Sequence, residues 1–148
     1  MKSCFFIGHR ETGEELYPSL MQAIRKHITE YGVTEFYVGN YGNFDQLAAR
    51  AVTEAKDQHP QIHLYMLIPY HPALRAVELR QGFDGTFYPP DMETVPHRFA
   101  IVRANRYMID HVDHLIAYVC HPASNAKKMV EYAQRRARKG LITVTLLE

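Results

Sequence analysis

Short apolar segments alternate along the chain with longer segments in which apolar residues recur every three or four positions. The short segments predict the five strands of a core sheet, at residues 3–7, 35–38, 62–68, 114–120 and 141–147. The longer segments predict helices, because a period of about 3.6 places their apolar residues on one face. Strands that alternate with helices predict an α/β fold of the doubly wound kind, in which helices cover both faces of a parallel sheet.

Capping residues indicate where the helices begin and end. The first helix begins near Pro18, which is tolerated in a first turn, and Gly32 stops it. In the second helix, we expect Asn43 to be the N-cap and Gln46 its reciprocal partner. Each of these helices follows a predicted strand, as the alternating pattern requires.

The second half of the chain has similar signals. Thr94 and Pro96 look like the N-cap and first position of a helix that reaches about His111. Ser124 can cap the last helix, and Gly140 ends it. Between the third strand and these helices, we expect a short helix over residues 72–82 and a short strand at residues 86–88.

Composition limits the functions to consider. The chain has 148 residues, of which 47% are hydrophobic, and its 17 basic and 16 acidic residues give a formal net charge of +1. No linker or repeat divides it, so we expect one domain over residues 1–148. The balanced charge argues against a chain-wide attraction to nucleic acid or membranes. With no signal-peptide pattern and no apolar run of about 20 residues, we expect a cytoplasmic protein.

The two cysteines, Cys4 and Cys120, lie in or at the end of apolar segments, where a free cysteine is usually buried. We expect both to be reduced, as is usual in the cytosol, and a disulfide between them is the alternative. Cys120 is followed by His121, but neighbours on a strand point to opposite faces. The pair is therefore a poor catalytic dyad unless the strand has already ended.

Glycines and polar residues follow several predicted strands. Gly8, His9 and Arg10 follow the first strand, and Gly39 and Asn40 follow the second. Ligands of open α/β sheets bind at the carboxyl ends of the strands, where backbone N–H groups and helix starts favour anions. We therefore predict a phosphate-like site in which an arginine fork and a histidine N–H contribute; the alternative for His9 and Arg10 is an exposed loop with a surface ion partner.

Other candidates have structural alternatives that the sequence leaves open. Asp45 could receive a ribose hydroxyl or only favour the helix dipole. Asn105 and Arg106 could reach a ligand cleft or belong to a solvated helix face. Ser124 and Asn125 could cradle a second phosphate at the start of the last helix.

The order of these motifs resembles the YpsA-like branch of the SLOG superfamily. The matching motifs are Gly8-His-Arg, Gly39 with the segment that begins at Phe44-Asp45, Pro69-Tyr70, and the segment that begins at Tyr107-Met-Ile-Asp. The resemblance covers nearly the whole chain. It implies a Rossmann-like three-layer sandwich with a mainly parallel central sheet flanked by helices, and a site for a nucleotide or ADP-ribose-like ligand.

One motif of the related Lonely Guy phosphoribohydrolases is missing. They carry Pro-Gly-Gly-x-Gly-Thr-x-x-Glu before the last helix, whereas this chain has Pro-Ala-Ser-Asn-Ala-Lys-Lys at residues 122–128. Glu131 is the nearest acid, but it is out of register, and such a shift turns a side chain far round the helix. Glu131 and Asp110 are therefore only weak candidates for a catalytic acid.

Three functions follow from these observations. The first is a binding module or sensor for a small nucleotide-type ligand that needs no cofactor. The second is a hydrolase of a nucleotide N-glycosidic bond. The third is a DNA- or RNA-associated module like the Smf/DprA relatives, which would use the basic last helix.

Histidines and exposed aromatic residues raise the questions of metal binding and self-association. We predict no metal site, because His111, Asp113 and His114 straddle a helix-to-strand junction and lack a regular ligand spacing. Exposed aromatic residues such as Tyr41 and Tyr70 could stack on a base or pack a homo-oligomer.

Overall fold

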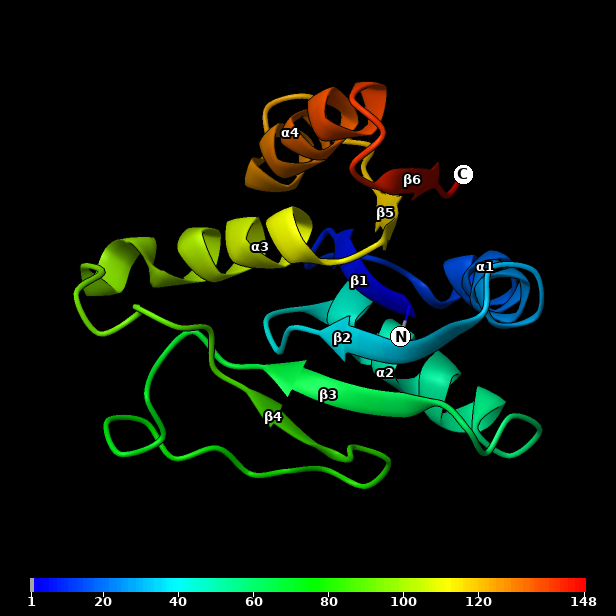
Figure 1. Ribbon diagram of the computed structural model, residues 1–148, viewed down its shortest axis with the longest axis horizontal. Helices are drawn as coiled ribbons and strands as arrows, with labels where there is room; N and C mark the ends of the chain where they lie inside the picture. Colours follow the sequence, from blue (N-terminus) through cyan, green and yellow to red (C-terminus); the bar gives the residue numbers. More distant parts are fainter. Residues whose placement is uncertain (1) are drawn as a thin grey trace.

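The computed structural model describes residues 2–148 and shows a parallel sheet with helices on both faces (Figure 1). The strands are β1 (Lys2–Gly8), β2 (Val33–Val38), β3 (His63–Leu67), β4 (Gly85–Phe87), β5 (His114–Tyr118) and β6 (Thr143–Leu146). The helices are α1 (Tyr17–Thr29), α2 (Asn43–Ala55), α3 (Ala100–His111) and α4 (Asn125–Arg138), with 3-10 turns η1 (Glu14–Leu16) and η2 (His97–Phe99).

The strand order is β4-β3-β2-β1-β5-β6, and every neighbouring pair is parallel. From β1 the chain builds outward through β2 and β3 to β4, and it then returns to the other side of β1 to form β5 and β6. The direction of winding therefore reverses between β1 and β5, where Gly8 lies opposite Tyr118. This arrangement confirms the Rossmann-like three-layer sandwich, and its switch point is the usual place for a ligand.

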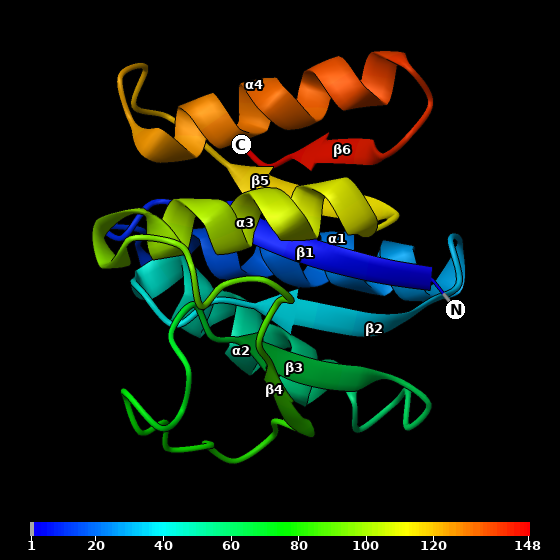
Figure 2. The same cartoon turned by 60° about the vertical axis from the view of Figure 1, so that its left-hand side comes forward.

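Side chains of alternating strand positions form two cores, one on each face of the sheet. Figure 2 shows α3 in front of the sheet and α1 and α2 behind it. Phe6 belongs to the core beneath α1 and α2, where its ring lies 6.0 Å from that of Phe36. Phe5 belongs to the core beneath α3 and α4. Because both faces are covered, the central strands consist of nearly continuous apolar residues, as parallel strands usually do.

The segment between β3 and β4 differs from its prediction. The helix expected over residues 72–82 is absent; only a turn forms, in which the N–H groups of Leu74 and Arg75 donate to the His71 carbonyl. The Leu74 side chain is 87% exposed. A short helix needs an apolar surface to pack against, and this segment lies outside the sheet edge. The short strand expected at residues 86–88 exists as β4 and makes the sheet six-stranded instead of five-stranded.

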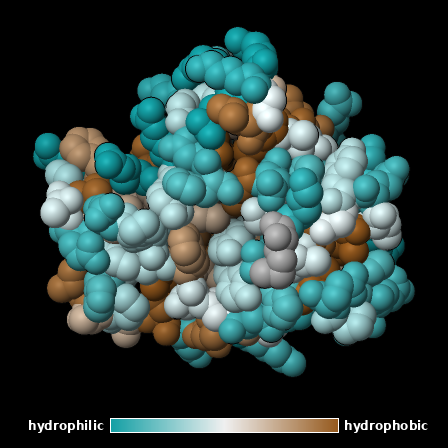
Figure 3. Space-filling view, viewed as in Figure 1, coloured by the Kyte–Doolittle hydropathy of each residue, from teal (hydrophilic) through white to brown (hydrophobic). Residues whose placement is uncertain are grey.

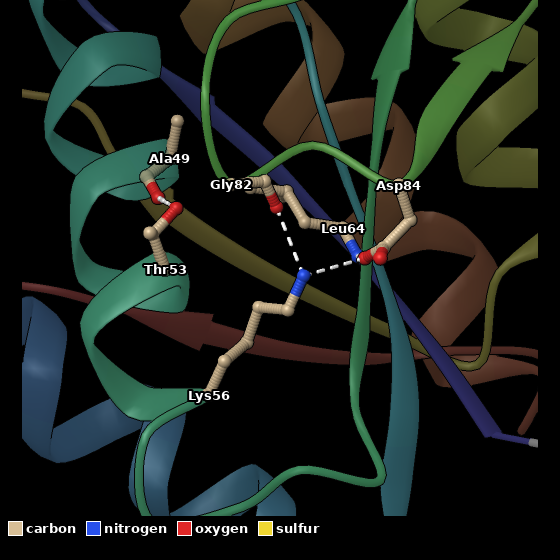
Figure 4. A network of polar contacts seen from close by, with 6 residues as sticks. All are labelled: Ala49, Thr53, Lys56, Leu64, Gly82 and Asp84. Carbon is tan, nitrogen blue, oxygen red and sulfur yellow. Dashed lines mark hydrogen bonds and ion pairs between the residues drawn. The ribbon is translucent and has the colours of Figure 1, made fainter.

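A polar network joins α2 to this edge of the sheet (Figure 4). The Nζ atom of Lys56 lies 2.7 Å from an Asp84 carboxylate oxygen and donates to the Gly82 carbonyl over 2.9 Å. The same Asp84 oxygen accepts the backbone N–H of Leu64 over 2.8 Å. These contacts fix the return of the chain into β4 where a helix is lacking.

The observed starts of the helices can be compared with the predicted N-cap residues. Ser124 is the N-cap of α4, as predicted, and its hydroxyl accepts the Lys127 N–H over 3.1 Å. The predictions for Asn43 and Thr94 are wrong. Gly42 precedes α2 in the N-cap position, and α3 begins only after η2. Backbone carbonyls of the first loop accept the N–H groups at the start of α2, so no side-chain cap is needed there.

The cysteines are free and far apart along the sheet. Cys4 is buried and pairs in register with His114, whereas Cys120 lies six residues beyond His114. At roughly 3.3 Å per residue, this separation is much longer than a disulfide can bridge. Cys120 is exposed, so the expectation that it is buried is wrong.

Within residues 2–148, no helix is long and apolar enough to cross a bilayer. On the face drawn in Figure 3, hydrophobic residues lie in small patches between hydrophilic ones. Patches of this kind are normal on protein surfaces.

Two buried histidines meet near the amino ends of the strands. The ring of His27, which is 1% exposed, lies 5.3 Å from the ring of His114. Nδ1 of His27 donates to the Ala23 carbonyl over 2.7 Å, and Nδ1 of His114 contacts the Thr143 hydroxyl. The Nε2 atoms of both histidines have no hydrogen-bond partner among the described residues. Burial lowers the pKa of each ring, so both are neutral in the folded protein near neutral pH.

We predict that acid destabilises the fold through these histidines. The unfolded chain binds protons at its ordinary pKa of about 6.5, whereas the folded chain resists protonation, so stability falls as pH falls below that value. The expected slope approaches about 1.4 kcal/mol per pH unit for each histidine that stays neutral. Urea unfolding between about pH 7.5 and pH 5 measures it. His27→Leu should flatten the dependence, and the exposed control His111→Asn should not; equal slopes in all three proteins would contradict the assignment.

Candidate functional site

A cavity of about 300 Å³ opens at the carboxyl ends of β1 and β2, beside the start of α4. Its volume is at the lower end of the range for small-molecule sites. Most of the residues predicted from the sequence line it. These are Gly8, His9, Arg10, Gly39, Asp45, Asn105, Ser124 and Asn125. The cavity therefore lies at the switch point of the sheet.

His9 ties the end of β1 to the chain that leaves β5. Its ring is buried, and Nε2 accepts the backbone N–H groups of Cys120 and His121 over 2.7 and 3.2 Å. The Thr12 hydroxyl donates to the His9 carbonyl over 2.7 Å. Burial and the neighbouring His121 ring lower the pKa of His9, which keeps the ring neutral. His9 therefore organises the loops, and its only N–H is at Nδ1.

Arg10 is held through its backbone while its side chain lines the cavity. Its carbonyl accepts the N–H of Asn43 over 2.9 Å, so the first and second loops are joined. Gly42 allows this approach, because its φ is 149° and an added Cβ would lie 2.6 Å from the Arg10 Cα. Such a position favours glycine strongly. Arg10 is the arginine of the cavity, and its guanidinium can form paired hydrogen bonds to a phosphate.

Asp45 is the carboxylate of the cavity. Its Oδ2 accepts the Tyr41 N–H over 3.1 Å, and a Cβ on Gly39 would lie 2.9 Å from that oxygen. Burial raises the pKa of Asp45 to about 6, although the Tyr41 N–H and the charges of Arg10 and Arg80 oppose the shift. A carboxyl group with this pKa can accept a hydroxyl hydrogen bond or exchange a proton near neutral pH.

The first turn of α4 forms the opposite wall. Ser124 caps the helix, and its hydroxyl also donates to the His121 carbonyl over 3.0 Å. Asn125 and Ala126 follow it and line the cavity. The first N–H groups of a helix lack partners within the helix and favour anions. The Ser124 hydroxyl therefore serves the cap, and a phosphate contact by this residue stays a prediction.

The rest of the wall is apolar, and sequence analysis did not single it out as part of a site. It comes from Leu67 at the end of β3, Ile101 and Val102 on α3, and Met129 on α4. In the sequence, apolar residues of this kind cannot be distinguished from residues of the hydrophobic core. Tyr41, for which the sequence left base stacking and self-association open, is half-buried and lines the cavity. Apolar walls of this kind are typical of small-molecule sites.

Four predicted residues lie outside the cavity. Asn40 lines a neighbouring hollow and accepts a hydrogen bond from Arg80 over 3.2 Å. Arg106 lies over the Tyr132 ring, 4.5 Å from its centroid. Asp110 pairs with Arg136 over 3.5 Å, and Glu131 is exposed on α4. Neither acid that we considered for catalysis therefore reaches the cavity.

The structure brings two histidines and a cysteine together, a grouping that the sequence did not predict. His111, Asp113 and His114 do not form a cluster: Asp113 accepts the N–H of Ser3 over 2.9 Å, and His114 belongs to the buried pair with His27. A ring nitrogen of His9, the Cys120 sulfur and a ring nitrogen of His121 lie within 4.8 Å of one another. β5 ends at Tyr118, so the opposite-face argument against Cys120 and His121 does not apply.

Comparison with known proteins adds no homologue. No family model matches the chain, and a search of curated proteins finds no match. The resemblance to the SLOG superfamily therefore stays a prediction.

The packing of the first turn of α2 against the end of β1 requires a glycine at position 8, independently of any role of Gly8 in ligand binding. A Cβ at this position would lie 2.1 Å from Cγ of Phe44, a buried residue in the first turn of α2. We predict that Gly8→Ala lowers the free energy of unfolding by about 1–3 kcal/mol through overpacking. Denaturant unfolding measures it. Gly13→Ala is the control, because its Cβ would meet only the flexible Glu15 side chain; a stable Gly8→Ala protein would refute the packing role.

Proposed function

We propose that the protein is a cytoplasmic binding module for a nucleotide or nucleotide-derived ligand. The observation that supports it is a single cavity in which an arginine and the start of a long helix lie beside an apolar wall. An anion and an apolar ring are the two parts of a nucleotide. The location at the switch point of a Rossmann-like sheet supports the same function.

Each part of such a ligand has a complementary wall. The phosphate would lie between Arg10 and the N-terminus of α4, where charge and helix dipole both favour it. The base would lie against Ile101 and Met129, where Asn105 offers an amide for hydrogen bonding. Asp45 would accept a ribose hydroxyl.

A second candidate function is hydrolysis of the N-glycosidic bond of the bound nucleotide. One observation favours it: the pKa of Asp45 is about 6, close to the value that suits a general acid or base near neutral pH. The acid would then be Asp45 instead of Glu131 or Asp110. Binding and hydrolysis differ in whether the ligand is recovered intact.

We predict that nucleotide-type ligands raise the unfolding temperature. A thermal-shift screen would use nucleoside mono-, di- and triphosphates, NAD, ADP-ribose and cyclic nucleotides. A ligand at about 100 times its Kd adds roughly 2.7 kcal/mol to the stability of the folded state. Chromatography of each stabilised mixture should recover the ligand intact, and recovered free base would establish the hydrolase instead. If no compound shifts the transition, the proposed function is wrong.

Arg10→Ala should weaken the binding of the ligand that stabilises the protein most in that screen. The loss of a charged hydrogen bond to phosphate corresponds to about 1.5–3 kcal/mol, or roughly ten- to 150-fold in Kd. Isothermal titration calorimetry measures it. Arg138→Ala, at the exposed far end of α4, is the matched control with the same change of charge. Equal affinities of the two variants would remove Arg10 from the site.

A further inference from the structure

Two adjacent strand ends bring together three side chains of the types that can bind transition metals. His9 directly follows β1, and Cys120 and His121 follow β5, the neighbouring strand on the switch-point side. Gly8 and Tyr118 pair in register, so the two loops begin at the same level of the sheet. The cluster therefore depends on the sheet topology and cannot be seen in the sequence spacing.

The distances within the cluster are close to those of a metal site. One atom from each residue lies within 4.8 Å of the other two. Zinc bonds of about 2.0–2.3 Å in tetrahedral geometry place ligand atoms roughly 3.3–3.8 Å apart. Cys120 and His121 are exposed, so their side chains can rotate inward, whereas His9 is buried and held.

We propose that His9, Cys120 and His121 form a binding site for a borderline-soft divalent metal, with Zn²⁺ as the best fit. Two imidazoles and a thiolate are the donors that zinc prefers over magnesium or calcium. Binding converts the Cys120 thiol to a thiolate and releases its proton to solvent. Three protein donors leave a tetrahedral ion one position for an exogenous ligand.

The hydrogen bonds of His9 indicate how the metal would enter. Nε2 accepts the N–H groups of Cys120 and His121, so it carries the lone pair of the neutral ring. Coordination through Nε2 exchanges these two hydrogen bonds for a metal bond. The segment around Cys120 must then shift. Because His9 also lines the cavity, the shift occurs at its wall.

The test is a Co²⁺ titration of the tag-free, reduced chain without nucleotide. Cobalt substitutes for zinc, and a thiolate-to-cobalt absorption band reports a Co–S bond. We expect the band to saturate at one Co²⁺ per chain and to disappear on addition of Zn²⁺. Cys120→Ser should abolish the band, although Cys4 remains in that variant. His121→Asn should weaken binding by about tenfold or more, given that even outer-shell changes reach that size.

Two controls keep the result interpretable. His111→Asn removes another exposed histidine and should bind as the wild type does. Zn²⁺ should also protect the wild-type Cys120 from alkylation, and the His121→Asn variant should lose that protection. The proposal is overturned if the wild type shows no thiolate band, if the band persists in Cys120→Ser, or if His121→Asn binds like the wild type. Because nucleotide is absent, these outcomes are independent of the proposed nucleotide function.

Discussion

The hydrogen bonds from the Cys120 and His121 amides to the His9 ring are the contacts on which the site depends. A parallel sheet aligns β1 and β5 only as far as Gly8 and Tyr118, and beyond that level the two loops have no ladder to hold them. His9 supplies the connection with a buried, neutral ring. The same residue belongs to the cavity wall. The contacts that join the two strand ends therefore also set the geometry of the ligand site.

Most of the architecture follows from the sequence because hydrophobic periodicity reports burial directly. Phe5 and Phe6 face different cores, and the run of apolar residues around them is the pattern of a strand covered on both faces. The helix predicted over residues 72–82 is wrong because its start and stop signals are local, whereas a short helix needs a packing surface. The N-cap predicted at Asn43 is wrong because carbonyls of a distant loop, and not a side chain, cap α2.

The candidate site was predictable in part. Arg10, Asp45 and Asn125 line the cavity because strand ends gather at one edge, a rule that sequence order alone can use. The grouping of Cys120 and His121 with His9 needed the strand order, which places β5 next to β1, and the end of β5 at Tyr118. The pKa of Asp45 depends on its burial, which no spacing rule provides.

The proposed function requires that an anionic nucleotide-type ligand binds between Arg10 and the start of α4. The most direct test follows backbone amide signals by NMR while ADP-ribose is added to the labelled chain. Binding at this site should produce saturable shifts at Gly8–Arg10, at Tyr41–Asp45 and at Asn125–Ala126. Shifts confined to the basic end of α4 around Arg138, or no shifts at all, would contradict it.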